Sequence, residues 1–394
     1  MTDHELGDFS ICTCAHDPLG RKSFLALGAA AVAGAGVLSA APRAASAAPP
    51  ARAASATPGA EIVTLGTCAG PPPVAGRTGM STALVLNGKV YLVDCGRASL
   101  TQFMNAGFET EDLRAIFITH LHADHVADLY NYFLLGAGWP VVEKSIRVPL
   151  PVYGPGSAGL PLPPPFPPTR PVDTAVPDAP VPGTADLMRH CTEAFAYSIN
   201  IFARDSGVMD VAKLIDVHEI PLPSPQARPL GPTAPPMKPV EIARFDDVRV
   251  TGILVPHGAC FPAYAFRFDT PHGSVVFSGD TTPTPNIIAL ARGADVLVHE
   301  AIALELYRKR GFPAPLLSHL SNSHTDVALI GGIAKEAGVK AVILSHLAPG
   351  NPAVMSQEQW QALADDSKRR AGFAGPMIVA AELNRFDLRG TRTA

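Results

Sequence analysis

Apolar positions after residue 60 recur in short blocks separated by turn-forming residues, and the blocks fall into two halves of similar plan. We expect strands at 61–66, 82–86, 90–94 and 113–118 in the first half and at 263–270, 274–278, 296–299, 341–345 and 377–381 in the second. We expect helices at 98–105, 126–135, 185–203, 326–337 and 357–370. The pattern therefore predicts two strand-rich halves accompanied by helices.

The residues between the expected strands support this division. Asn87-Gly88 separates the strands at 82–86 and 90–94, and this pair suits the positive φ angles of a tight hairpin turn. Pro271-His272-Gly273 separates the corresponding pair in the second half. Two strand-rich halves with helices outside them predict a sandwich of two sheets covered by helices.

Proline-rich stretches interrupt the plan between the two halves. Residues 149–182 carry thirteen prolines and 221–239 carry eight, which is too many for interior strands or helices. We interpret about 149–239 as one insertion around the helix expected at 185–203. It is either a surface loop without a role or a cover over a cleft that selects substrate.

The first 56 residues differ from the rest and have the order of an export signal. Arg21-Lys22 precedes Ser23-Phe24-Leu25 and an Ala/Gly-rich apolar run, and Ala-Ser-Ala sites follow at Ala47 and Ala56. This order resembles a twin-arginine signal with lysine at the second position. We expect residues 1–56 to direct the chain through the export machinery to the periplasm or the exterior, and 57–394 to form one domain. An uncleaved signal that anchors the chain in a membrane is the alternative.

Charge and cysteine content add two limits. The formal net charge is −4, which argues against a protein whose main task is unspecific contact with nucleic-acid backbones. Four cysteines follow the signal, at Cys68, Cys95, Cys191 and Cys260. Their spacing leaves disulfides and buried free thiols equally open.

Candidate chemistry begins directly after the strand expected at 113–118. His120, His122, Asp124 and His125 fall within six residues there. A short bend can direct two imidazoles at one cation and a carboxylate with an imidazole at a second. Borderline cations such as zinc favour these nitrogen and oxygen ligands. We therefore predict a metal site at the end of this strand.

Three further candidates stand at strand ends in the second half. His257 follows an apolar run at 252–256, Asp280 follows 276–279, and His346 follows 342–345. Because such strand ends converge on one edge of a sheet sandwich, these side chains can complete the site. Each also has a structural alternative: a turn residue, a hairpin cap and a polar surface group, respectively.

These residues resemble the metallo-β-lactamase-fold hydrolases, and within that superfamily the branch of ribonuclease Z and the zinc arylsulfatases. The matching stretches are Thr64-Leu65-Gly66-Thr67 with Gly70-Pro71, Leu92-Val93-Asp94-Cys95-Gly96, Thr119 to His125, Val255-Pro256-His257-Gly258, Phe277-Ser278-Gly279-Asp280-Thr281, Val298-His299-Glu300-Ala301 and Leu344-Ser345-His346. They follow the family order and span most of 61–390 outside the insertion. The resemblance implies an α/β fold of four layers, αββα.

The resemblance also implies roles for individual residues. His120, His122 and His257 would hold one divalent metal ion, Asp124, His125 and His346 the other, with Asp280 bridging and zinc the expected metal. His324, with Glu300 as its partner, would assist departure of the leaving oxygen. Asp94 matches a position that is chiefly structural and is left outside the ligand set.

Such a centre predicts hydrolysis. Two cations about 3.5–4 Å apart lower the pKa of a bridging water enough to supply hydroxide near neutral pH. Asp124 and Asp280 can accept a proton or hydrogen bond from that water, and His324, oriented by Glu300, can protonate the leaving group.

Several features separate the chain from transfer-RNA 3′ processing. The predicted export signal, the acidic balance and Arg97, where the family usually has glutamate, disfavour RNA as the substrate, and the insertion does not resemble a basic RNA-binding arm. We therefore expect a ribonuclease Z-like phosphodiesterase acting on a small phosphodiester or ester. The alternatives are an arylsulfatase or lactonase of the same fold and a non-catalytic metal-binding scaffold. A dimer is compatible with the resemblance.

Overall fold

A computed structural model describes residues 59–159 and 174–393. The predicted export signal at 1–56 lies outside these residues, as does part of the predicted insertion. Among the described residues no helix combines the length and apolar character that crossing a membrane requires.

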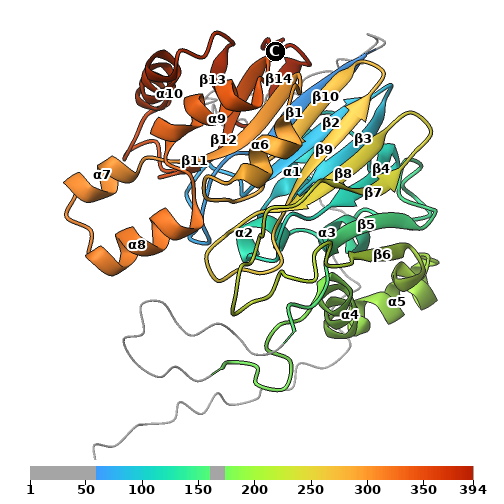
Figure 1. Cartoon of the computed structure of the whole chain (residues 1–394). Coiled ribbons are helices and arrows are strands. Elements are labelled where there is room, and N and C mark those ends of the chain that lie inside the picture. The colour runs from blue at the N-terminus through green and yellow to red at the C-terminus, as the bar shows by residue number, and fades with distance from the viewer. Residues whose placement is uncertain (1–58, 160–173, 394) are drawn as a thin grey trace, which may run out of the picture. The chain divides into compact units, whose positions relative to one another are not determined.

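Two seven-stranded sheets form the centre of the described chain (Figure 1). The first has the order β14-β1-β2-β3-β4-β5-β6, and the second has the order β13-β12-β11-β10-β9-β8-β7. The strands of the first sheet are β1 (Ala60–Gly66), β2 (Ser81–Leu86), β3 (Lys89–Val93), β4 (Leu113–Phe117), β5 (Leu150–Pro155), β6 (Ile215–Ile220) and β14 (Asn384–Asp387). The strands of the second are β7 (Val240–Arg244), β8 (Arg249–Leu254), β9 (Tyr264–Thr270), β10 (Gly273–Phe277), β11 (Val296–Ile302), β12 (Ala341–Ala348) and β13 (Met377–Val379).

Helices lie on the outer faces of both sheets. The first sheet packs against α1 (Ser99–Asn105), α2 (Ala123–Val126), α3 (Asn131–Leu134), α4 (Thr184–Ala194) and α5 (Ala196–Ser206), with short 3-10 turns at Thr110–Asp112 and Val211–Lys213. The second packs against α6 (Pro285–Ala291), α9 (Val327–Ala337) and α10 (Gln357–Ala371). A helical pair, α7 (Leu304–Lys309) and α8 (Ala314–Ser323), extends from the end of β11.

Three apolar clusters hold these layers together. Phe117, Phe266 and Phe268 belong to the cluster between the two sheets. Phe103 belongs to the cluster between the first sheet and its helices, and Trp360 belongs to the cluster between the second sheet and its helices. Because the inner strands of each sheet are buried on both faces, they appear in the sequence as nearly continuous apolar runs, whereas the edge strands β6 and β7 are partly exposed. The four-layer αββα fold expected from the sequence is confirmed.

The structure also contains the tight turn and the helix caps that the local sequence favours. Asn87 and Gly88 have φ angles of 50° and 81° between β2 and β3, as the hairpin prediction requires. The Asp326 side chain accepts a hydrogen bond from the Ala328 N–H at the start of α9, and Gly338, with φ 66°, ends that helix.

The helix expected at 126–135 is instead two short helical segments, α2 and α3. The His125 carbonyl accepts a hydrogen bond from the Cys95 N–H at 2.7 Å, and the Asp128 N–H donates to the Cys95 carbonyl at 2.9 Å. These backbone groups bond to the loop after β3, so the helix does not continue through them.

Two segments of the predicted insertion at about 149–239 form strands of the first sheet. β5 and β6 lie within it and extend the first sheet in parallel beyond β4. Pro151 and Pro155 are accommodated because they flank Val152 and Tyr153, the β5 residues that pair with β4. The helix expected at 185–203 corresponds to α4 and α5.

Candidate metal centre

The predicted site residues are brought together at one edge of the sandwich. The loop Thr119–His122 follows β4, His257 lies just beyond β8, and Asp280 lies just beyond β10. His346 occupies a bulge of β12, where the pairing with β11 skips one residue between Ser345 and Leu347. Its φ of 46° reflects this irregular backbone, which turns the side chain out of the strand alternation.

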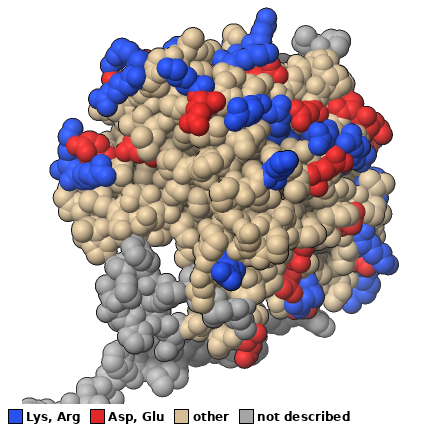
Figure 2. All heavy atoms as spheres, in the orientation of Figure 1, with Lys and Arg blue, Asp and Glu red and all other residues tan. Residues whose placement is uncertain are grey.

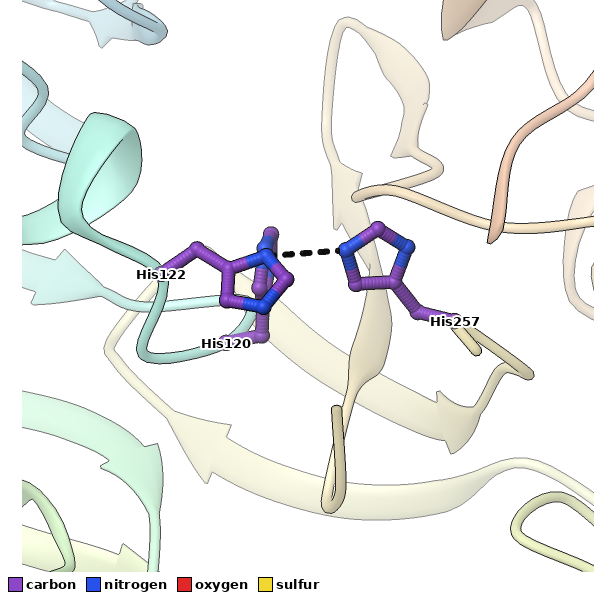
Figure 3. Close-up of side chains that lie close together, drawn as sticks. All are labelled: His120, His122 and His257. Carbon is purple, nitrogen blue, oxygen red and sulfur yellow. Dashed lines mark hydrogen bonds between the residues drawn. The ribbon is translucent and has the colours of Figure 1, made fainter. Parts of the chain in front are cut away.

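Three imidazoles form the first group of candidate ligands. Nδ1 of His122 lies 3.0 Å from Nε2 of His257, and His120 lies beside both rings (Figure 3). Two nitrogen ligands at 2.0–2.1 Å from a tetrahedral zinc would be about 3.3 Å apart. The His257 ring is held by the Ser323 carbonyl, 2.7 Å from its Nδ1, so that Nε2 faces the group. This spacing fits a shared cation.

Asp124, His125 and His346 form the second group. Oδ2 of Asp124 lies 3.2 Å from Nε2 of His346 and 3.6 Å from Nε2 of His125. The backbone N–H of Gly70 donates a hydrogen bond to the same oxygen at 3.0 Å. A carboxylate and two ring nitrogens therefore converge from two separate segments, α2 and β12.

Asp280 lies between the two groups. Its Oδ2 is 3.2 Å from His346 Nε2 and 3.5 Å from His125 Nε2 on the side of the second group. The same oxygen is 3.7 Å from His257 Nε2 and 3.9 Å from His120 Nε2 in the first group. A single carboxylate oxygen thus approaches nitrogen atoms of both groups.

Unpaired buried atoms provide a test of whether these residues fit a metal. Nε2 of His120, Nε2 of His125 and Oδ1 of Asp280 are buried and have no hydrogen-bond partner among the described residues. Buried polar atoms are rarely left without a partner, because desolvation without a hydrogen bond is costly. Nitrogen and oxygen atoms clustered in this way fit divalent cations such as zinc.

The buried imidazoles differ in the direction of their pKa shifts. Burial lowers the pKa of His120 and lowers that of His257 to about 3, so both rings are neutral, as metal ligation requires. For His125, burial alone would lower the pKa, but the carboxylates of Asp280 and Asp94 outweigh it and raise the pKa. A cation in the second group would therefore take the place of a proton.

Sequence reasoning overlooked the contact that orients His125. Oδ2 of Asp94 lies 2.8 Å from Nδ1 of His125, and Oδ1 accepts a hydrogen bond from the Thr119 N–H at 2.8 Å. This contact directs Nε2 of His125 toward the ligand groups. The signal available in the sequence was a carboxylate directly after the apolar strand 90–93, and the structural role assigned to Asp94 is consistent with it.

His324 and Glu300 also lie at the centre. Nδ1 of His324 is 3.4 Å from Oε1 of Glu300, and that oxygen accepts hydrogen bonds from the backbone N–H groups of Thr281 and Thr325. Burial alone would lower the pKa of His324, but the charge of Glu300 raises it to about 9. The ring is 14% exposed, so it can meet a bound molecule, and its Nδ1 faces Glu300 without a hydrogen bond to another described residue.

The four cysteines predicted to be either free or paired are all free in the structure. Burial raises the pKa of the Cys95 thiol and raises that of Cys260 to about 12. Both thiols therefore stay protonated near neutral pH.

The sequence is similar to those of known proteins. The sequence model of the metallo-β-lactamase superfamily matches residues 75–328. A ribonuclease Z from Mycobacterium bovis is 28% identical over 335 residues, which cover 84% of this chain and 99% of that relative.

Solved structures show the same fold. Human tRNase Z, short form, aligns over 83% of this chain and 99% of its own, with a TM-score of 0.52 and 17% identity. A metallo-β-lactamase fold protein from Bacillus subtilis aligns over 83% and 99%, with a TM-score of 0.51 and 19% identity.

Proposed function

Because this chain belongs to the metallo-β-lactamase superfamily and is a metal-dependent hydrolase, we propose that it hydrolyses phosphodiester bonds at a centre of two divalent cations. The observation that carries the proposal is the position of Asp280, whose Oδ2 lies 3.2–3.9 Å from nitrogen atoms of both ligand groups.

Seven side chains would hold the two cations. His120, His122 and His257 would bind one, Asp124, His125 and His346 the other, and Asp280 both. Zinc suits this set of imidazoles and carboxylates. When bound, the pair supplies a water of lowered pKa and positive charge that polarises the ester oxygen.

The protein's own groups would orient the reaction. Asp280 and Asp124 are in place to accept a hydrogen bond from the attacking water, and the Gly70 N–H fixes Asp124. The charge of Glu300 attracts the protonated His324 ring on its Nδ1 side, which leaves the other ring nitrogen to protonate a departing oxygen. Proton transfer by such a positioned histidine contributes about 10²–10⁴-fold to rate.

The substrate class rests on the relatives and on charge. Curated relatives named ribonuclease Z span most of the chain, which favours a phosphodiester over an aryl sulfate or a lactone. On the face in Figure 2, basic and acidic side chains are interspersed and large areas are uncharged. An RNA-binding protein usually presents a continuous basic surface, and this face shows none, which supports our proposal of a small phosphodiester rather than RNA. Export of the enzyme through its N-terminal signal remains part of this proposal.

A substrate panel tests the proposal. Purified protein with measured metal content would be assayed with bis(p-nitrophenyl) phosphate, p-nitrophenyl sulfate, an aromatic lactone and a precursor transfer RNA. We expect turnover of the phosphodiester and two equivalents of metal per chain. Protein that binds no metal would contradict the metal centre, whereas cleavage of the sulfate or lactone alone would contradict the substrate class. Efficient cleavage of the transfer RNA would identify RNA as the substrate.

A further inference from the structure

A hollow of about 90 Å³ adjoins the metal centre on the side of Asp124. The loop Gly70–Pro72 lines one side of it, and Ala123 and Ala127, at either end of α2, line another. Arg97 also lines it. A cavity needs only about 10–15 Å³ of such volume to hold one water, so the hollow has room for several waters or one compact oxyanion.

Two glycines bring the segments around this hollow into close contact. A Cβ atom at Gly96 would lie 2.2 Å from the Asp124 carbonyl oxygen, and one at Gly79 would lie 2.7 Å from the Arg97 backbone nitrogen. The Gly79 N–H also donates to the Arg97 carbonyl at 3.0 Å. Because these segments touch through their backbones, Arg97 is fixed directly beside the metal centre.

The guanidinium of Arg97 has unused donors. Its Nη2 donates to the carbonyl oxygens of Arg77, at 2.5 Å, and Val74, at 3.5 Å. Among the described residues, Nε and Nη1 of Arg97 have no hydrogen-bond acceptor and no carboxylate lies within salt-bridge distance. The neighbouring Arg77 differs, because it is paired with Glu382 at 2.7 Å. Arg97 is therefore a fixed positive charge with free donors facing solvent.

We propose that this hollow binds an oxyanion that the substrate carries next to the bond that is cut, with Arg97 as its charged ligand. The inference rests on the proposed function and refines it. The substrate would be a phosphodiester with a second negative group, either another phosphate or a carboxylate. Free N–H donors of a guanidinium suit either oxyanion, because they form charge-assisted hydrogen bonds with both.

Matched substrates test the inference. The first would be a thymidine dinucleotide ending in a p-nitrophenyl phosphodiester, and the second would have an uncharged methylphosphonate as its internal linkage. A third substrate would have a carboxymethyl group at the same internal linkage. The measurement is the ratio of kcat/KM for each charged substrate to that for the neutral one, using the full-length enzyme with its metals.

We expect the wild type to prefer the charged substrates and Arg97→Gln to reduce that preference about 10- to 100-fold, the effect of losing one charged hydrogen bond. Arg97→Lys should restore part of it. Arg370→Ala, which removes an exposed arginine on α10, is the matched control and should leave the ratio unchanged. A loop displaced by the substitution would slow all substrates equally and leave the ratio unaltered.

Three outcomes are decisive. An equal preference in the wild type and Arg97→Gln, or none in the wild type, would overturn the inference. A preference for phosphate over carboxylate, or the reverse, would identify the source of the oxyanion. If the wild type hydrolysed none of the substrates, the proposed function would fail. Isothermal titration of the charged and neutral dinucleotides would then still test the hollow. If the wild type binds the charged dinucleotide more tightly and Arg97→Gln loses this difference, the inference is supported. If the wild type binds both dinucleotides equally, the inference is overturned.

Discussion

The carboxylate of Asp94 fixes the imidazole of His125, with Oδ2 of the first 2.8 Å from Nδ1 of the second. The two residues are far apart in sequence: Asp94 directly follows β3, and His125 lies in α2. Their contact leaves Nε2 of His125 as the atom that faces the candidate ligands.

Substitution of Asp94 should therefore weaken metal binding without removing a ligand. We expect Asp94→Ala to lower metal affinity about 10- to 100-fold, as loss of a carboxylate behind a ligating histidine typically does. It should also destabilise the fold by about 1–3 kcal/mol, since the buried Thr119 N–H loses its acceptor. Competition with a chelator and thermal unfolding would measure the two effects. Unchanged metal affinity would show that Asp94 serves the fold alone.

Asp280→Ala should abolish turnover. The substitution removes the one oxygen that approaches both ligand groups and leaves two sets of imidazoles without the carboxylate between them. Metal content and hydrolysis would be measured together, with Asp269→Ala, at a carboxylate near the far end of β9, as the control. Full activity in Asp280→Ala would contradict the bridging assignment.

His324→Ala should slow substrates with poor leaving groups far more than substrates with good ones. An alkyl phosphodiester needs a proton on its departing oxygen, whereas p-nitrophenolate leaves readily without one. We expect kcat for the alkyl ester to fall about 10²–10⁴-fold, with a much smaller change for the p-nitrophenyl ester. Glu300→Gln should give a weaker effect of the same pattern. An equal loss with both leaving groups would indicate a structural role for His324.

Removal of metal should destabilise the protein as well as inactivate it. Without a cation, the buried atoms His120 Nε2, His125 Nε2 and Asp280 Oδ1 have no partner among the described residues. We expect a chelator to lower Tm and zinc to restore both Tm and turnover, because a ligand that binds only the folded state stabilises it. An unchanged Tm after verified metal removal would be inconsistent with a cation bound by these atoms.

Gly96→Ala should disturb the centre through its backbone. The added Cβ would lie 2.2 Å from the Asp124 carbonyl oxygen, so the two segments must separate. We expect a loss of about 1–3 kcal/mol in the free energy of unfolding and weaker metal binding. Gly332→Ala in α9 is the matched control, because a Cβ there meets nothing within 4 Å and alanine favours a helix. Equal stability of the two variants would contradict the close approach.

Much of the fold could be predicted from the sequence because its signals are local. The strand runs, the Asn87-Gly88 turn and the capping residue Asp326 each depend on nearby residues only. The prediction of a single helix at 126–135 was wrong because backbone groups in this region bond to Cys95, which lies in another segment. Proline density similarly concealed β5, because density does not reveal that Pro151 and Pro155 flank the residues that pair with β4.

The sequence by itself determined the kinds of atoms available to the centre, since histidine and aspartate at strand ends define the donors whatever their distances. Only the tertiary structure decided the distances between Asp280 and the two groups, the contact by which Asp94 orients His125, and the position of Arg97 beside Asp124 with free donors. These relations join segments far apart in the chain. Their geometry depends on how both sheets pack, and no periodicity along the sequence encodes it.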